Sequence, residues 1–476
     1  MQKEISFILD GAVRKLDFRD DGLITPTTTL LNYLRSLPTH KGVKEGCAEG
    51  DCGACTVVIA EPNGEGRMKY KAVDSCLVFL PMLHGKQVIT VENLKDDQLH
   101  PVQQAMVDTN GSQCGFCTPG FIMSLLSLYK NTQTPSRAEI DDALTGNLCR
   151  CTGYKPIVEA AASSCAHSGM DRFTREEPVT VNLINSISPA SVHVQTGRQE
   201  YFRPASLGEA ITLKHGHADA VVINGATDVA LRVTKRHELI GKIIDLSAVE
   251  ELQMLRRDGD AISIGAGVTL SRLMPEIRAD YPALHDMLSV FGSLQIRNLA
   301  TLGGNLGTAS PIGDMLPALM AYEGRLVLEG INGKREIPLH AYVTGYRTTV
   351  RKPDELITEI IIPKPQPGTV VRSYKISKRK DLDISTVSAG FSRRLDDQGN
   401  AASVILAYGG MAGKTARASA TEKFLLGKRW ERQVVEEAGT YLENDFRPIS
   451  DARGGAEMRR VAAKNLLLKF WTMSRG

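Results

Sequence analysis

Eight of the nine cysteines lie in four tight groups before residue 152, and this clustering limits the possible folds more than any other feature of the sequence. In a reducing compartment, grouped thiols are metal ligands more often than a disulfide framework. A chain of 476 residues also exceeds what one hydrophobic core usually organises. We therefore expect several domains, the first of them built around bound metal. The ninth cysteine, Cys165, stands apart and is interpreted as a structural thiol.

Charge and hydropathy argue against two classes of partner. The formal net charge is +3 and is spread along the chain, so no basic face predicts nucleic acid or anionic lipid as a partner. The first residues, MQKEISFILDGAVRKL, lack the long apolar segment of a signal peptide, and no later stretch approaches about 20 apolar residues. We expect a cytoplasmic protein that binds neither nucleic acid nor membrane.

Residues 1–92 are expected to form a small α+β module. An alternating apolar run over residues 5–9 ends at an Asp-Gly turn, which predicts a hairpin. Thr29 or a neighbouring Thr can cap a short helix, and β-like runs follow at 56–59 and 87–91.

This module holds the first candidate metal site. Cys47, Cys52 and Cys55 have the spacing C-x4-C-x2-C, and Cys76 stands farther on, as in the plant-type ferredoxin arrangement around a 2Fe-2S cluster. Glycines between them can turn backbone N–H groups toward the sulfurs of an anionic cluster. Structural zinc is the alternative, although zinc sites seldom combine a four-residue gap with a two-residue gap.

Residues 93–165 are expected to form a second, helical domain. Pro101 and Pro119 stand where first-turn prolines are tolerated, and Ser136 and Glu139 have the spacing of a capping box. These signals predict a four-helix unit over about 100–165.

The helical domain holds the second candidate metal site. Cys114 and Cys117 precede one expected helix, and Cys149 and Cys151 precede another. Helix N-termini favour thiolate over thiol and help to hold an anionic cluster. Two such loops facing each other predict a second four-sulfur cage, for which spacing alone also allows zinc. The adjacent ferredoxin-like site favours a second 2Fe-2S cluster.

The remaining chain is expected to contain a linker and two more domains. Residues 166–198 have neither helical nor strand periodicity and are interpreted as a linker. Residues 199–371 alternate helices with β-rich runs, and a new run of strands opens a C-terminal α+β domain at 372–476. The predicted fold class is therefore a multidomain α+β protein.

Two glycine-rich segments are candidates for binding phosphate through backbone N–H groups. They are VVINGATD, residues 221–228, and TLGGNLGTASPIGD, residues 301–314. The sequence lacks a G-x-G-x-x-G signature, and Gly265-Ala266-Gly267 is too short to count as one. Ordinary glycine loops would explain either segment alone.

Three strings carry a resemblance to a known family. GCAEGDCGAC (46–55), QCGFCTPGF (113–121) and GNLCRCTGY (146–154) resemble the iron-sulfur domains of the molybdenum hydroxylases, the xanthine dehydrogenase and aldehyde oxidase family, closely over residues 1–165. The resemblance implies a β-grasp ferredoxin fold, a four-helix 2Fe-2S domain, a PCMH-type FAD-binding domain and a C-terminal domain of the CO dehydrogenase flavoprotein type. It also implies that Gln113, Cys114 and Cys151 face the molybdopterin of a large partner subunit, with Gln113 touching the pterin.

The same resemblance implies an FAD site. Gly225, Ala226 and Thr227 would hold the pyrophosphate region, and Gly304, Asn305 and Thr308 would add contacts. The other cofactor-binding residues would be Val222, Ile223, Asn224, Asp228 and Thr301. Asp314 would bond the ribose or adenine end. Ala226 stands where a polar residue is common in relatives, which removes a possible side-chain contact but leaves the backbone N–H groups.

Two further elements are expected near the flavin ring. By resemblance Phe291 lies over the ring where nicotinamide docks, although an isolated Phe is more often a core residue. The loop SKRKDLDI, 377–384, matches a segment that runs near the flavin in relatives, so Lys378, Arg379 and Asp381 are expected on the acceptor side. The alternative interpretation of this loop is a solvated turn.

The implied function is electron transfer within an oxidoreductase. The order of domains resembles the iron-sulfur and flavin subunit of bacterial xanthine dehydrogenases, which implies oxidation of hypoxanthine or xanthine to urate at the partner's molybdenum centre. Electrons would pass through the second cluster, the first cluster and FAD to NAD, in a heterotetramer or larger assembly. The chain stops after the C-terminal domain, so the substrate site is expected elsewhere. Alternatives are an aldehyde or N-heterocycle hydroxylase, a stand-alone flavin and iron-sulfur reductase, and a zinc-structured scaffold.

Overall fold

The computed structural model describes residues 3–18, 24–166 and 171–475. Contacts divide the chain into two compact units, the first made of 1–213, 219–249 and 292–300, the second of 214–218, 250–291 and 301–476. The predicted flavin domain, 199–371, therefore contributes to both units, and its boundaries stay a prediction. Each unit is described by itself.

The first unit begins with a five-stranded sheet of order β2-β1-β5-β3-β4, in which β1 runs parallel to β5. This mixed order is that of a β-grasp fold, as expected. Thr29 caps the helix by accepting a hydrogen bond from the Asn32 N–H at 3.2 Å, which confirms the predicted cap. The elements are β1 (Glu4–Leu9), β2 (Ala12–Asp17), α1 (Leu30–Ser36), β3 (Thr56–Pro62), β4 (Met68–Asp74) and β5 (Gln87–Ile89).

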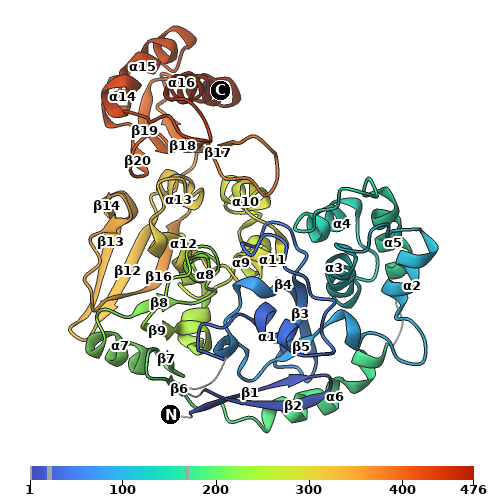
Figure 1. The fold of residues 1–476 in the computed structure, drawn as a ribbon. Coiled ribbons are helices and arrows are strands. Elements are labelled where there is room, and N and C mark those ends of the chain that lie inside the picture. The colour runs from blue at the N-terminus through green and yellow to red at the C-terminus, as the bar shows by residue number, and fades with distance from the viewer. Residues whose placement is uncertain (1–2, 19–23, 167–170, 476) are drawn as a thin grey trace. The chain divides into compact units, whose positions relative to one another are not determined.

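Four helices follow, as predicted, and Figure 1 shows them gathered beside that sheet. The predicted capping box is present, because the Glu139 N–H donates to Ser136 Oγ at 3.3 Å and the Ser136 N–H donates to Glu139 Oε2 at 2.7 Å. The helices are α2 (Pro101–Asp108), α3 (Thr118–Asn131), α4 (Arg137–Leu144) and α5 (Lys155–Ala166).

The prediction that 166–198 lacks regular structure is wrong for its described part; residues 167–170 lie outside the described residues. The segment contains α6 (Arg172–Asn185) and β6 (Val192–Gln195). The buried side chains of α6 recur at helical spacing but include Glu177 and Thr180, so the apolar period is interrupted. Glu177 is accommodated because the Tyr70 hydroxyl donates to its carboxylate at 3.0 Å. Pro178 within the helix hides the pattern further.

Asp171 at the start of α6 provides a test of this packing. Its carboxylate accepts hydrogen bonds from Lys130 Nζ at 2.9 Å, from the Thr174 N–H at 2.7 Å and, at 3.2 Å, from His100 Nε2. Burial alone would raise the pKa of Asp171, but hydrogen bonds from His100, Lys130 and Thr174 hold that pKa well below its ordinary value. We expect Asp171→Asn to cost about 3 kcal/mol of stability at neutral pH, because it breaks a buried ion pair.

The pH dependence of this effect has a definite sign. A carboxyl whose folded pKa is depressed stabilises the protein above its unfolded pKa, and this stabilisation is lost as the pH falls toward the folded pKa. The wild-type advantage over Asp171→Asn should therefore hold from neutral pH down to about pH 4 and narrow below it. Denaturant midpoints measured across pH test this. Asp141→Asn is the control, since its exposed pair with Arg137 should contribute under about 1 kcal/mol. If the stability difference between wild type and Asp171→Asn grew on acidification, the depressed pKa assigned to Asp171 would be wrong.

The rest of the first unit is a four-stranded sheet of order β6-β7-β9-β8, in which β7 and β8 both run parallel to β9. Parallel strands joined by helices bring their carboxyl ends to one edge, where ligands commonly bind. The short helix α11 (Leu294–Arg297) also belongs to this unit. The other elements are β7 (Glu200–Arg203), β8 (Val221–Ile223), α8 (Ala230–Thr234) and β9 (Lys242–Asp245); α7 (Leu207–Gly216) links to the second unit.

The second unit contains an antiparallel sheet of order β10-β11-β16-β12-β13. Its strands are β10 (Leu255–Asp258), β11 (Ala261–Gly265), β12 (Arg325–Gly330), β13 (Gly333–Pro338) and β16 (Leu356–Pro363), beside a small ribbon of β14 (Val343–Gly345) and β15 (Thr348–Thr349). Its helices are α9 (Leu270–Ile277), α10 (Pro282–Ser289), α12 (Leu302–Thr308) and α13 (Met315–Ala321).

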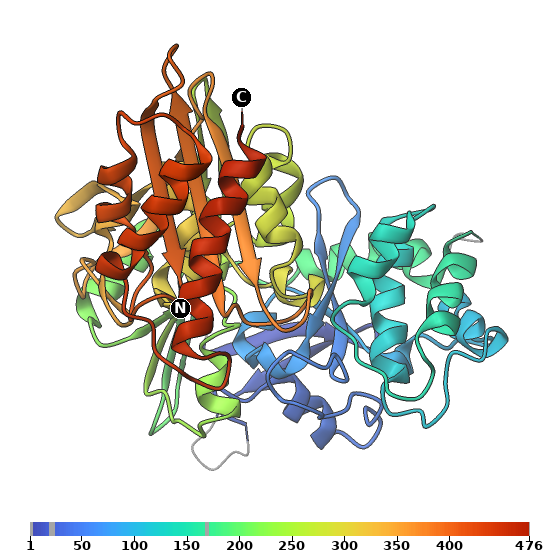
Figure 2. The same cartoon turned by 90° about the horizontal axis from the view of Figure 1, so that it is seen from above.

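The C-terminal part of the second unit is a four-stranded sheet of order β17-β18-β19-β20. Figure 2 shows the three last helices lying across one face of its strands. The rings of Phe391, Tyr408 and Phe470 meet in the core between them. The elements are β17 (Val370–Ile376), β18 (Val387–Leu395), β19 (Ala401–Gly409), β20 (Ala416–Arg417), α14 (Ser419–Leu425), α15 (Arg432–Asp445) and α16 (Ala456–Met473). Among the described residues, no helix combines the length and the apolar character that a membrane span requires.

Candidate functional site: two cysteine centres and a flavin-binding region

The first four predicted ligands lie in two pairs of hydrogen-bonded thiols. Cys47 pairs with Cys52 in the loop between α1 and β3, and Cys55 pairs with Cys76, which follows β4. The first pair is half-buried, whereas Cys55 and Cys76 are buried. The loop therefore has an inner and an outer pair of thiols.

Hydrogen bonds from Cys52 and from backbone N–H groups favour the thiolate form of Cys47. The hydrogen bond from Cys52 lowers the pKa of Cys47 to about 5, against the effect of burial and with the help of the Glu49 and Asp51 N–H groups. Those two N–H groups lie 3.4 and 3.3 Å from Cys47 Sγ. The backbone donors to Cys47 are thus not the glycines that the sequence analysis predicted. The Gly50 N–H does, however, donate a hydrogen bond to Cys76.

The second four predicted ligands form two pairs as well. Cys114 pairs with Cys151, and Cys117, the residue that precedes α3, pairs with Cys149. Burial raises the pKa of Cys117 to about 12. For Cys149 burial acts in the same direction, but the Thr152 hydroxyl and the N–H groups of Thr152 and Cys151 lower its pKa to about 7. Cys114 and Cys151 are exposed, so this centre has an edge at the surface.

Pairs of thiols fit a two-iron cluster, in which each iron takes two protein ligands. A structural zinc ion instead draws four ligands around one point. The donor set and its pairing therefore fit two 2Fe-2S clusters, which when bound would supply one-electron carriers.

The two cysteine loops contact each other directly. The Leu148 N–H donates to the Cys52 carbonyl at 3.0 Å, and Asn147 Nδ2 donates to the Gly53 carbonyl at 3.0 Å. Gly53 has φ +65°, and a Cβ there would lie 2.3 Å from the Gly146 carbonyl oxygen. Glycine is therefore required at this contact.

Sequence reasoning missed the buried polar network behind this contact. Ser124 Oγ and Gln295 Nε2 donate to Asn147 Oδ1 at 2.6 and 3.1 Å, and Gln295 also reaches the Ala143 carbonyl. Gln295 and Asn147 are 0% and 2% exposed. Neither Gln295 nor Asn147 was singled out by the sequence analysis as a functional residue. Burial and pairing across 148 positions are visible only in the fold.

The two loops that carry the exposed thiols of the second centre also expose three large side chains, which we call the apolar rim. Phe116, Leu148 and Tyr154, from the two loops that carry Cys114 and Cys151, are 47%, 41% and 40% exposed. Gln113 is exposed beside them. Large apolar side chains exposed on neighbouring loops are typical of a surface that another protein covers.

The predicted FAD contacts fall in both units. In the first unit, residues 224–228 form the turn between β8 and α8, at the carboxyl end of β8. Gly225 packs so tightly that a Cβ would lie 1.7 Å from the Leu299 carbonyl oxygen. Ala226 has φ +59°, a conformation that Asn tolerates better than Ala.

In the second unit, the first N–H groups of α12 are already used. Leu302 and Gly303 donate to the carbonyls of Val268 and Ala266, and the Gly304 N–H donates to Thr301 Oγ1 at 3.0 Å. Thr301 and Gly304 therefore bond each other instead of offering a free N–H. Asn305 Oδ1, by contrast, is buried and has no partner among the described residues. It is the acceptor in this segment that a bound cofactor would satisfy, and Thr308 ends the same helix.

The Asp314 carboxylate already accepts hydrogen bonds from two other side chains. It accepts from Lys375 Nζ at 2.9 Å and from the Ser385 hydroxyl, and Lys375 also donates to the Val290 carbonyl at 3.1 Å. The contact with Val290 supports the turn that carries Phe291. Phe291 itself is half-buried, which differs from a ring that only fills the core.

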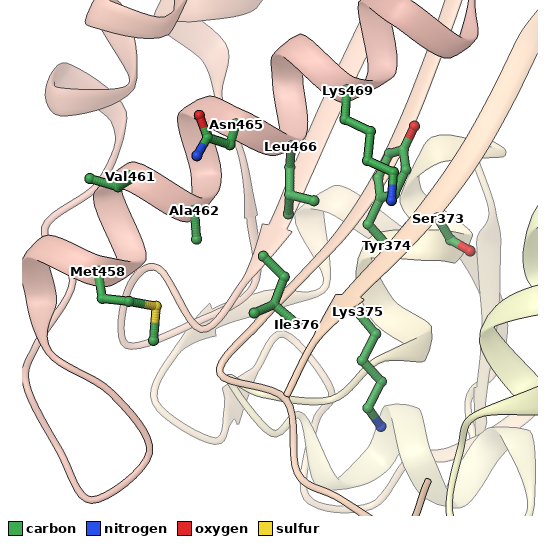
Figure 3. A pocket seen from close by; sticks show the side chains of 10 residues that line it. All are labelled: Ser373, Tyr374, Lys375, Ile376, Met458, Val461, Ala462, Asn465, Leu466 and Lys469. Atoms are coloured by element: carbon green, nitrogen blue, oxygen red, sulfur yellow. The ribbon is translucent and has the colours of Figure 1, made fainter. Parts of the chain in front are cut away.

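The charged loop 377–384 is largely solvated. Lys378 is exposed and donates to the Ala452 carbonyl at 3.0 Å, while Arg379 pairs with Asp383 inside the loop. A nearby groove of about 580 Å³ lies between β17 and α16. Figure 3 shows its side chains, with the Lys375 ammonium directed away from α16. None of the predicted cofactor contacts lines this groove.

Three family models match successive parts of the chain. They describe a [2Fe-2S] binding domain over residues 90–162, an FAD binding domain in molybdopterin dehydrogenase over 194–365, and a CO dehydrogenase flavoprotein C-terminal domain over 372–474. The matches agree with the second cysteine centre and with both FAD segments.

Individual proteins give the same answer. Xanthine dehydrogenases of Drosophila subobscura and Emericella nidulans are each 33% identical to this chain over 94% and 98% of its length. The chain spans 38% of the length of each of these relatives. A solved carbon monoxide dehydrogenase chain from Hydrogenophaga pseudoflava is 27% identical, with a TM-score of 0.54, over 57% of this chain and 95% of that one. Together these matches show that the chain belongs to the molybdenum hydroxylase family and contains its iron-sulfur and FAD-binding domains.

Proposed function

We propose that this chain is the electron-transfer subunit of a cytoplasmic, molybdenum-containing xanthine dehydrogenase. Electrons from hypoxanthine or xanthine, oxidised to urate at a molybdopterin in a large partner subunit, would pass through two 2Fe-2S clusters to FAD and then to NAD. The ligands are Cys47, Cys52, Cys55 and Cys76 for one cluster, and Cys114, Cys117, Cys149 and Cys151 for the other. The xanthine dehydrogenase relatives support the choice of substrate.

The exposed edge of the second centre is the observation that carries this proposal. Cys114 and Cys151 reach the surface on the loops that also expose Phe116, Leu148 and Tyr154. Desolvating such a rim favours association, and a cluster held by those loops would lie within reach of a donor in the covering protein. The contact between this centre and the Cys52 loop supports the proposed order of transfer, from the second cluster to the first.

Purification at native expression level tests the proposal. A large molybdenum-containing subunit should accompany this chain, in a heterotetramer or larger assembly, and the protein should be brown. Addition of xanthine without NAD should then bleach the visible iron-sulfur absorption. A colourless protein, or a brown protein that never binds a large subunit, would overturn the proposal in favour of a zinc scaffold or a stand-alone reductase.

The carbon monoxide dehydrogenase match supports a second candidate, in which the same module serves a different substrate. This chain covers 95% of that solved chain, whereas it covers 38% of the xanthine dehydrogenases. Substrate-dependent bleaching distinguishes the two candidates, because different electron donors are compared on the same protein. Reduction by carbon monoxide, an aldehyde or an N-heterocycle, without reduction by purines, would transfer the assignment to that enzyme class.

Gln113 provides a prediction about the point of electron entry. We expect Gln113→Ala to slow purine-dependent reduction of the clusters about tenfold, because one hydrogen bond at the exposed edge is worth about 1 kcal/mol or more. NADH-to-dye turnover through FAD should stay normal. Gln98→Ala, an exposed glutamine in the segment before α2, is the matched control and should change neither rate. Equal loss of both activities in Gln113→Ala would contradict the assignment.

Phe291 provides a prediction about the point of electron exit. If its half-buried ring lies over the flavin, Phe291→Ala should keep FAD and fold but lower NAD-linked relative to dye-linked turnover about fivefold, since a stacking contact is worth about 1 kcal/mol. Phe391→Leu is the control, because Phe391 is a buried core ring of the same unit. That variant should lose stability and keep the ratio. An unchanged ratio of NAD-linked to dye-linked turnover, together with depleted FAD, would show that Phe291 is a core residue.

A further inference from the structure

Lys235 connects the predicted flavin turn with the first cysteine loop. It follows α8, the helix that begins just after residues 224–228, and all of these residues belong to the first unit. Its Nζ donates to the Cys47 carbonyl at 3.0 Å and lies 3.3 Å from Glu49 Oε2. No sequence motif includes this lysine, and the contact joins positions 188 residues apart.

Lys235 is positively charged, whereas the loop that it contacts carries negative charge. Glu45, Glu49 and Asp51 all lie in or next to this loop, and a cluster held by four thiolates would be anionic before it accepts an electron. Reduction adds one more negative charge at the same place. A fixed cation within hydrogen-bond distance of a ligand's carbonyl stabilises the reduced form more than the oxidised form.

We propose that Lys235 is a positioning residue that raises the reduction potential of the cluster at Cys47. The proposal rests on the proposed function, since it requires a 2Fe-2S cluster at that loop. Lys235 would hold the Cys47 carbonyl in place and supply the positive charge that favours electron arrival at the first cluster. Because it extends from the helix beside the predicted flavin turn, the same contact would fix the loop against the flavin-binding segment.

Two properties of the contact make the proposal testable. The Lys235 side chain is 45% exposed, so its effect is electrostatic at a partly solvated site and should weaken as salt is raised. Glu49 carries the opposite charge at the same position. Neutralising Glu49 should therefore shift the potential in the direction opposite to neutralising Lys235.

The experiment is a redox titration of the purified complex followed by electron paramagnetic resonance, with iron content measured for each variant. Lys235→Met should lower the midpoint of one signal and leave the other unchanged. A tenfold change in the reduction equilibrium would appear as a shift of about 59 mV. Lys235→Gln, which can still donate a hydrogen bond, should behave like Lys235→Met, whereas Lys235→Arg should keep the wild-type midpoint. Glu49→Gln should raise it.

Lys242→Met is the matched control, because Lys242 is a partly exposed lysine of the same unit paired with Asp219 at 3.9 Å. It should leave both midpoints unchanged. Unshifted midpoints in Lys235→Met and Lys235→Gln, with full iron content, would overturn the inference while leaving the proposed function intact. Loss of iron without a shift in the remaining cluster would also overturn it, because Lys235 would then only support the loop. A wild-type complex without iron-sulfur signals would overturn the proposed function itself.

Discussion

Replacing Cys52 with serine should remove one of two iron-sulfur signals and leave the other signal and FAD in place. Iron content should fall from about four to about two atoms per chain, since each cluster holds two irons and Cys52 serves one cluster. Serine has nearly the size of cysteine but cannot provide a thiolate. The effect is a complete loss of one centre and not a graded change.

The structure explains why this loss should stay local. The contact from the first loop to the second uses the carbonyl of Cys52, and a serine retains that carbonyl for the Leu148 N–H. The thiol of Cys52 interacts with Cys47 and with the Ala54 N–H, both of which belong to the first loop. Effects at sites that share no side-chain partner are expected to be independent.

Cys165→Ser is the control for this prediction. Cys165 is 1% exposed in the helical core, and burial raises the pKa of its thiol, as expected for a structural cysteine. Its replacement should keep both signals and the full iron content. If Cys52→Ser lost both signals together with FAD, the predicted division of 1–92 from the later domains would be wrong.

Replacing Asn147 with alanine should destabilise the junction between the two centres by about 4 kcal/mol. The amide donates to the Gly53 carbonyl and to Thr56 Oγ1 at 3.0 and 3.1 Å, and its oxygen accepts from Ser124 and Gln295. Alanine would leave several buried polar groups without partners, and each costs about 1 to 3 kcal/mol. The urea concentration at which the visible absorption disappears should fall accordingly.

Asn147 should also affect both clusters at once. It lies two residues before Cys149, and its amide binds the carbonyl of Gly53, which lies between Cys52 and Cys55. Both resonance signals should therefore shift in Asn147→Ala, unlike in Cys52→Ser. Asn63→Ala is the matched control, because the Asn63 side chain bonds the Glu65 and Arg67 N–H groups and the Glu65 carboxylate within one exposed turn. A perturbation limited to one signal would show that the network does not couple the two loops.

Much of the local structure could be predicted because local physics decides it. Thr29 and Ser136 cap their helices as their spacing indicates, and the four helices after Pro101 lie where their first-turn signals place them. The segment around Glu177 was missed because a buried carboxylate satisfied by a tyrosine reads as polar in the sequence. Periodicity detects apolar faces, and this face is partly polar.

The predicted site shows the same division at a larger scale. The sequence by itself determined the eight cysteine positions, their four groups and the two glycine-rich segments, because ligand type and spacing are written along the chain. Only the tertiary structure decided that the thiols lie in pairs, that Gln295 meets Asn147 and that Lys235 reaches Cys47. The contacts of Gln295 and Lys235 join residues 148 and 188 positions apart in the chain. Their formation depends on how whole elements pack to bury apolar surface and satisfy buried polar groups, which no local pattern specifies.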